Sequence, residues 1–385
     1  MQTSRLRPRT GLAALLAAVA LTAACGEAPE RETASDTASG SGSGGSAETA
    51  TSAEELGGME ALVEAAKEEG TLNVIALPPD WANYGEMIST FSEKYGIAVD
   101  SAQPDASSQD EINAAEQLAG TDRAPDVFDL GSAVARANVD MFAPYQVETW
   151  DDIPDDLKDP EGRHVSDYTG FMSIGYDAGA VPAPTSVEDL LKPEYKGKVA
   201  LNGDPTQAGA AFNGVVMAAI GTGGSPDDIQ PGIDFFAKLK DAGNFLPVDP
   251  TPATIASGQT PVVIDWDYTN AAQTEALAGQ RDWQVVVPEG AVVSSYYQQA
   301  INKDAPHPAA ARLWQEFVFS DEGQNLWLKG FARPVRAAAM EEAGTIDEES
   351  FGALPEAQGD AVNLTPEQEE AAKTVLGAGW AQAIS

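Results

Sequence analysis

The chain has 385 residues, with 60 acidic and 22 basic side chains and a formal net charge of −38. Such an acidic surface repels nucleic acid and anionic lipid, which argues against a nucleic-acid partner, and it concentrates cations nearby. The same charge is also typical of a protein that only needs solvation in a salty habitat. Because the chain has a single cysteine, it forms no internal disulfide, and its core must hold the fold.

The first residues have the features of a secretion signal. Three arginines are followed by an apolar run over residues 12–24, which is shorter than the ~20 residues of a membrane-spanning helix. We therefore predict a signal peptide over residues 1–24. The run ends in Leu21-Thr22-Ala23-Ala24 before Cys25, which resembles a bacterial lipobox, so Cys25 is expected to be lipidated. The alternative is an ordinary signal peptide that ends near a cysteine.

Residues 25–54 are rich in Gly, Ser, Thr, Ala and Glu and are predicted to be a flexible linker. The remaining chain shows an α/β pattern. A helix over 59–69, a strand over 72–77, a helix over 85–95 and a strand over 97–101 make a βαβ unit. Further strands are predicted at 127–130, 172–176, 199–201, 262–264, 284–287 and 299–301. Further helices are predicted at 110–119, 208–219, 233–240, 269–278, 309–319 and 322–328.

Catalytic motifs are scarce. His164 and His307 are the only histidines, and each is flanked by charge or proline. The sequence has no H-E-x-x-H, G-x-S-x-G or P-loop motif. We therefore expect no enzyme activity and no metal or other cofactor. A secreted hydrolase that uses Asp and Glu is the enzyme alternative, because carboxylates are abundant. The second alternative is a scaffold or adhesin lipoprotein that binds no ligand.

Three segments carry a resemblance to a known family. They are E-A-A-K-E-E-G-T-L at 64–72, L-L-K-P-E-Y-K-G-K-V at 190–199, and A-P-H-P-A-A-A through S-D-E-G-Q at 305–324. They resemble the bacterial extracellular solute-binding proteins of ABC importers, in the group that takes up polyamines, ferric ion, thiamine and aminophosphonates. The resemblance implies an α/β, two-lobe type II periplasmic-binding-protein fold with a hinge and an interlobe ligand cleft.

The same resemblance implies the organisation and partners of the chain. The first lobe is expected over 55–168 and, with the C-terminal helices, over 290–385; the second lobe is expected over 169–289. Crossings between the lobes are expected near 168–170 and 288–292. The expected partners are a small-molecule ligand and a membrane permease. The protein is expected to be a monomer that only its lipid holds on the outer face of the cytoplasmic membrane, outside the cell.

Loops at the carboxyl ends of the strands are expected to face the cleft. The loop after the first strand offers Asp80, Trp81 and Tyr84, a carboxylate and two rings that suit an amine. Two predicted helix starts offer backbone N–H groups to an anion or carbonyl. Their residues are Ser108, Gln109, Asp204, Thr206 and Gln207. Simple N-capping by Ser108 and Thr206 explains them equally well.

The stretch Ile264-Asp265-Trp266-Asp267-Tyr268 is the most informative. The resemblance places it where ferric-binding members carry adjacent tyrosines. Carboxylates pair with ammonium groups and aromatic faces attract cations, so the stretch favours an organic cation such as a polyamine, with Asp267 as its main counter-ion. Because Tyr296 and Tyr297 form an adjacent tyrosine pair, a ferric ligand remains an alternative. Aminophosphonate binding is a further alternative. In the plain structural alternative, Trp266 and Tyr268 only pack the lobe.

Overall fold

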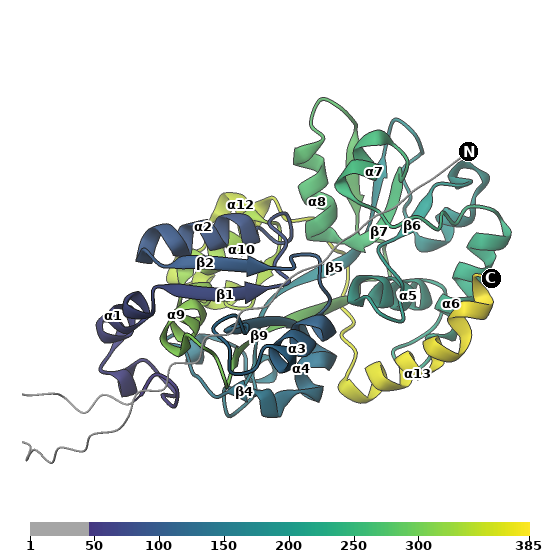
Figure 1. Cartoon of the computed structure of the whole chain (residues 1–385). Helices are drawn as coiled ribbons and strands as arrows, with labels where there is room; N and C mark the ends of the chain where they lie inside the picture. The colour runs from purple at the N-terminus through teal and green to yellow at the C-terminus, as the bar shows by residue number, and fades with distance from the viewer. Residues whose placement is uncertain (1–45) are drawn as a thin grey trace, which may run out of the picture. The chain divides into compact units, whose positions relative to one another are not determined.

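The computed structural model describes residues 46–385 (Figure 1). The predicted signal peptide, Cys25 and most of the predicted linker lie outside these residues. The last part of that linker is corrected: Ala50 and Ala53 are buried, and Arg312 donates to the carbonyl oxygen of Ala50 at 2.8 Å. Within the described residues, no helix combines the length and apolarity needed to cross a membrane.

Within residues 46–385, ten strands form two sheets. The small sheet pairs β1 and β2 in parallel, and the large sheet has the order β3-β9-β5-β7-β6, with β10 and β8 on β5 and β4 on β9. The strands are β1 (Thr71–Ile75), β2 (Ala98–Ala102), β3 (Val127–Gly131), β4 (Phe142–Ala143), β5 (Val165–Asp177), β6 (Val199–Leu201), β7 (Val262–Trp266), β8 (Trp283–Val286), β9 (Ser294–Asn302) and β10 (Arg333–Pro334).

The α-helices cover these strands. They are α1 (Met59–Glu69), α2 (Tyr84–Tyr95), α3 (Ser108–Gln117), α4 (Ser132–Ala137), α5 (Gly209–Gly221), α6 (Gln230–Asp241), α7 (Pro252–Ser257), α8 (Asp267–Ala276), α9 (Pro308–Val318), α10 (Asp321–Lys329), α11 (Ala337–Ala343), α12 (Glu348–Gly352) and α13 (Pro366–Ala383). Every predicted helix and strand is found, most of them within a few residues of the predicted bounds, although β5 and β9 begin well before the predicted strands. α9 and α10 show why: Pro308 starts α9, and the Ser320 hydroxyl caps α10 by accepting from Gly323 N at 3.1 Å.

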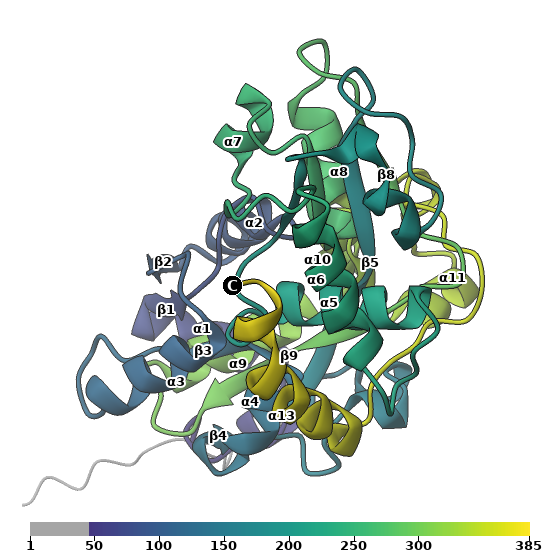
Figure 2. The same cartoon turned by 90° about the vertical axis from the view of Figure 1, so that its right-hand side faces the viewer.

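β5 is longer than the predicted strand and joins the two halves of the large sheet. Its first half, Val165–Phe171, pairs with β9 and β10, whereas Met172–Asp177 pairs with β7 and β8. We call the part with β1 to β4, β9 and α1 to α4 the first lobe, and the part with β6 to β8 and α5 to α8 the second lobe (Figures 1 and 2). The predicted boundaries at residues 169 and 289 stay a prediction.

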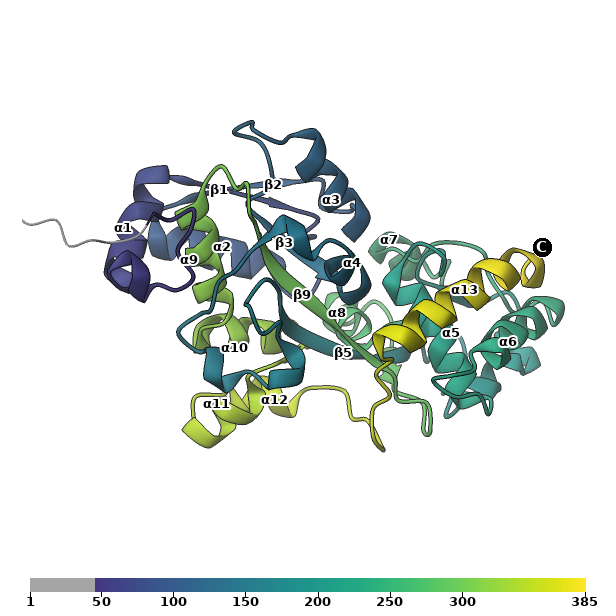
Figure 3. The same cartoon turned by 90° about the horizontal axis from the view of Figure 1, so that it is seen from below.

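The last helix corrects one part of that prediction. Residues 290–385 were all expected in the first lobe, but α13 packs along α6 of the second lobe (Figure 3). The Trp380 ring lies 5.2 Å from that of Phe236. The chain therefore passes between the lobes a third time, along residues 355–365, where Val362 bridges to Val293. Periodicity predicts that a helix forms, whereas the partner of its apolar face depends on contacts distant in sequence.

Candidate functional site

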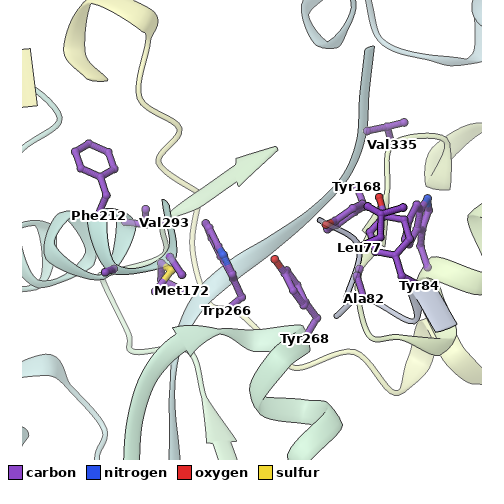
Figure 4. Packing of buried hydrophobic residues seen from close by; sticks show 14 of the residues in the cluster. Leu77, Ala82, Tyr84, Tyr168, Met172, Phe212, Trp266, Tyr268, Val293 and Val335 are labelled. Carbon is purple, nitrogen blue, oxygen red and sulfur yellow. The ribbon is translucent and has the colours of Figure 1, made fainter. Parts of the chain in front are cut away.

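Five aromatic rings gather where the two lobes meet. We call them the aromatic cluster: Trp81, Tyr168, Trp266, Tyr268 and Tyr297. The Trp81 ring lies 5.4 Å from Tyr268 and 5.8 Å from Tyr297, both edge to face, and Tyr168 stacks on Tyr297 at 5.5 Å. Figure 4 shows Trp266, Tyr268 and Tyr168 in a row across the junction. The cluster thus joins the loop after β1 and β9 of the first lobe to the start of α8 in the second.

The close approach of Tyr268 to β5 depends on a glycine. A Cβ atom at Gly170 would lie 2.5 Å from Tyr268 Cδ1 and 2.8 Å from Asp267 Oδ1. Since real Cβ atoms do not approach other atoms so closely, a larger residue there would push the ring off the strand. Gly170 therefore sets the place of the Tyr268 ring.

The loop that carries Trp81 has a strained backbone. Ala76, Ala82 and Asn83 have φ of 56°, 44° and 68°, a region that alanine seldom occupies. Such residues cost on the order of 1–3 kcal/mol each and persist only where surrounding contacts impose them. Gly330 makes one such contact. It packs so closely against the loop that a Cβ atom at this position would lie 2.6 Å from the carbonyl carbon of Ala82. The loop is thus held in one conformation with the Trp81 indole in the cluster.

A buried carboxylate lies behind the rings. Trp81 Nε1 donates to Tyr168 Oη at 2.8 Å, and the hydroxyls of Tyr168 and Tyr84 donate to Asp129 Oδ2 at 3.3 and 2.7 Å. Asp129 Oδ1 is buried and accepts no hydrogen bond from any described residue. Burial raises the pKa of Asp129 to about 7, although the tyrosine hydroxyls lower it.

A second carboxylate, Asp167, is close to the first. It accepts from Gln299 Nε2 at 2.9 Å and from Tyr168 N at 2.7 Å. Burial, and then the negative charge of Asp129, raises the pKa of Asp167 well above its usual range. Two neighbouring carboxylates cannot both ionise cheaply, so the pair needs either a shared proton or a cation.

A third carboxylate, Asp265, comes from the second lobe. Its oxygens accept from Asn202 Nδ2 and Trp266 N, both at 2.8 Å. Burial raises the pKa of Asp265 to about 7, and these two hydrogen bonds lower it. Burial, and then the charges of Asp129 and Asp265, raises the pKa of the Tyr297 hydroxyl. Carboxylates from both lobes therefore act on the same ring of the cluster.

Asp267 has a different role from the one expected. It is fully buried, accepts from Phe171 N at 2.8 Å and from Tyr268 N at 3.0 Å, and forms an ion pair with Arg333 of β10. Its charge is thus balanced within the protein. The expectation that Asp267 serves as the main counter-ion of the ligand is corrected, because β10, which is distant in sequence, supplies its cation.

The other predicted site residues divide into two groups. The structure brings Trp81, Tyr84, Asp265, Trp266, Tyr268 and Tyr297 together in or beside the cluster. The remaining ones lie elsewhere. Asp80 and Gln109 are exposed, Ser108 Oγ accepts from Gly131 N at 3.0 Å, and Tyr296 lies on the opposite face of β9. Asp204, Thr206 and Gln207 are also exposed, and Asp204 Oδ1 accepts from Thr206 N at 2.8 Å. The capping alternative is wrong for both residues, because Ser107 caps α3 and Ala208 precedes α5 without a side-chain cap.

Sequence reasoning missed Asp129, Asp167 and Tyr168. Asp129 had a usable signal, because it is the single charged residue in the apolar strand Val127-Phe128-Asp129-Leu130. Within residues 46–385, no group of three or more His, Cys, Asp or Glu side chains is arranged to hold a metal ion.

Comparison with known proteins agrees with this architecture. A family model described as bacterial extracellular solute-binding protein matches residues 125–353, which is more than half of the chain. The chain belongs to this family, which places it in the periplasm or on the cell surface. No curated protein sequence matches the chain significantly.

Solved structures show the same fold at low identity. AfuA from Actinobacillus pleuropneumoniae, with fructose-6-phosphate bound, is 18% identical with a TM-score of 0.60, over 82% of this chain and 98% of that one. Iron-bound HitA from Pseudomonas aeruginosa is 18% identical with a TM-score of 0.57, over 81% and 99%. The spermidine/putrescine-transporter protein PotD from Streptococcus pneumoniae is 16% identical with a TM-score of 0.58, over 82% and 99%. The chain therefore has the type II periplasmic-binding-protein fold. Because these proteins are associated with different solutes, the solute of this chain has to be argued from its own residues.

Proposed function

We propose that this solute-binding protein captures a small organic cation, of the polyamine kind, in the aromatic cluster and delivers it unchanged to the permease of an ABC importer. The proposal depends on one observation. Asp129, Asp167 and Asp265 are buried around the cluster, and none of them forms an ion pair with a Lys, Arg or His of the described chain. Asp126 and Asp177, which are also buried, do have such partners, whereas the buried Glu111 and Glu316 accept hydrogen bonds only from neutral groups.

The aromatic rings of the cluster also favour a cation as the ligand. Aromatic faces attract cations by ~0.5–2 kcal/mol per contact, and more when water is excluded. The Tyr268 hydroxyl is buried and has no hydrogen-bond partner among the described residues. A bound ammonium group could donate to this oxygen and to the carboxylates while its methylene chain lies against the rings. The charge, the unpaired oxygen and the ring faces thus favour the same class of ligand.

Entry of the solute requires the lobes to separate. The edge-to-face contact of Trp81 with Tyr268 at 5.4 Å fills the space between the first and second lobes. Opening would move the Trp81 loop away and expose the carboxylates, and the bound cation would then stabilise the closed state by bridging both lobes. The permease could distinguish loaded from empty protein by this closure.

Spermidine should bind saturably, with an affinity that falls in acid. Its amines stay protonated between pH 8 and pH 5.5, whereas Asp265, with a pKa of about 7, becomes neutral. One such carboxyl predicts a roughly 30-fold weaker affinity at pH 5.5 than at pH 8. Titration calorimetry at the two pH values measures this change.

Ferric ion and fructose-6-phosphate serve as comparison ligands in the same experiment. Tight binding of either with no response to spermidine would contradict the proposal and favour the ferric or the phosphate-type alternative. Consumption of any of these compounds would instead indicate an enzyme.

We also propose that Cys25 carries a lipid that tethers the protein to the outer face of the cytoplasmic membrane. Replacing Cys25 with serine should release most of the protein into the medium with its spermidine affinity unchanged, because the described fold begins well after this residue. Cell fractionation and immunoblotting measure the release. Ser41→Ala, a change in the same predicted linker, is the control and should stay on the membrane. Retention of Cys25→Ser would contradict lipidation.

A further inference from the structure

A polar cavity lies on the opposite face of β9 from the aromatic cluster. Its volume is about 750 Å³, within the range of ~300–1,000 Å³ that is typical of small-molecule sites. Side chains alternate along a strand: Tyr296 and Gln298 line the cavity, with Ser294 and Ser295 at the start of β9, whereas Tyr297 belongs to the cluster. The strand itself thus separates the two places.

The walls of the cavity come from both lobes. Ser132 and Arg136 of α4 lie on the first-lobe side, Phe212 and Asn213 of α5 lie on the second-lobe side, and residues 363–369 approach from the third crossing. A molecule in this space would therefore contact three separate parts of the chain.

The charges on the walls are already balanced. Arg136 pairs with Glu369 at 2.5 Å, Arg163 with Asp159 at 3.2 Å, and Lys158 with Asp155 at 3.3 Å. The remaining charged wall residue, Asp156, is exposed to solvent. An anionic guest would gain no free counter-ion here, and a cationic guest would find only the solvent-exposed Asp156, whereas a neutral guest loses no charge hydration on entry.

Neutral hydrogen-bonding groups are available. Asn213 uses Nδ2 to donate to Gly209 O at 2.9 Å, which leaves its Oδ1 free to accept. Asn363 uses Oδ1 to accept from Ser294 Oγ at 2.7 Å, which leaves its Nδ2 free to donate. The Tyr296 hydroxyl makes no hydrogen bond to another described residue.

These groups define the class of guest. A free acceptor, a free donor and a phenol face the same space as the rings of Tyr296 and Phe212, which can cover the apolar face of a pyranose ring. We propose that this cavity is a second binding site, for a neutral saccharide of one or two sugar rings, distinct from the cation site of the cluster.

Calorimetric titration of the full chain with glucose, trehalose and maltose tests the proposal. At least one of these sugars should bind with a 1:1 stoichiometry. Tyr296→Phe, which removes only the hydroxyl, should weaken that sugar about fivefold, and Asn213→Leu should weaken it at least tenfold. Glu370→Gln, an exposed change on α13, is the matched control and should bind like the wild type.

The result is independent of the cation proposal. Saturating spermidine should leave the sugar stoichiometry at one, because the two ligands occupy different faces of β9. Absence of binding by all three sugars at millimolar concentration would overturn the second site. So would sugar binding that spermidine competes away, or that Tyr296→Phe and Asn213→Leu leave unchanged while their thermal unfolding shows an intact fold.

Discussion

Asp265→Asn is expected to make the empty protein more stable at pH 8 and at the same time to abolish binding of the cation. The pKa of Asp265 is about 7 in the fold, against 3.8 for an unperturbed carboxyl. A raised pKa means that the fold prefers the protonated form, so wild-type stability falls as the pH rises from about 4 to about 7. Asparagine has no charge to bury, and we expect a gain of about 1–3 kcal/mol at pH 8.

Urea unfolding at pH 5 and pH 8 measures this effect, and spermidine titration measures the loss of affinity. The stability difference between wild type and variant should shrink towards pH 5, where the wild-type carboxyl is largely protonated. Glu289→Gln, an exposed acid on a loop, is the control and should change neither quantity. A variant that is less stable at pH 8 and binds spermidine normally would show that Asp265 is only structural.

Arg333→Met is expected to destabilise the protein by about 3–5 kcal/mol, because it leaves the buried Asp267 without its cation. The Arg333 guanidinium also donates to Pro355 O at 2.6 Å and lies 4.1 Å from the centre of the Phe171 ring. Methionine keeps most of the apolar stem, so the loss reports mainly the charge.

The pH dependence and a double variant test this explanation. Burial raises the pKa of Asp267 and Arg333 lowers it, so without the arginine the carboxyl should titrate higher and the stability loss should grow from pH 5 to pH 8. Adding Asp267→Asn should recover much of the loss in urea unfolding. A single-variant cost below about 1 kcal/mol would mean that the pair is not coupled in the fold.

The sequence predicted the rings of the cluster better than its charges. Trp81, Trp266 and Tyr268 follow strand ends, where residues of an open α/β sheet converge, so their meeting was predictable. Whether Asp265 or Asp267 remains unpaired depends on the turn from β7 into α8 and on Arg333 of β10, which no local pattern reveals. Asp267, the expected counter-ion, is instead paired with Arg333.

The fold shows the same contrast between local and distant information. Strand and helix positions follow apolar periodicity and were found, but the first half of β5 was missed because Ser166, Asp167 and Thr169 interrupt its apolar pattern. These polar residues are buried because β9 and β10 flank them. Asp129 was missed for a similar reason: its position opposite Gln299 follows from the antiparallel register of β3 and β9.

The pairing of β5 with β9 also constrains the order in which the chain can fold. Val165 pairs with Gln299, and the second lobe lies between them in sequence. A chain emerging with its N-terminus first can complete β6, β7 and α5 while the first lobe still lacks β9 and α9, which cover β3 and α1. The first lobe, although it starts the sequence, therefore cannot close its core until β9 and α9 have followed the strands of the second lobe, and α13 then covers α6 of the second lobe last of all. These pairings between distant parts of the sequence predict slow late steps of folding.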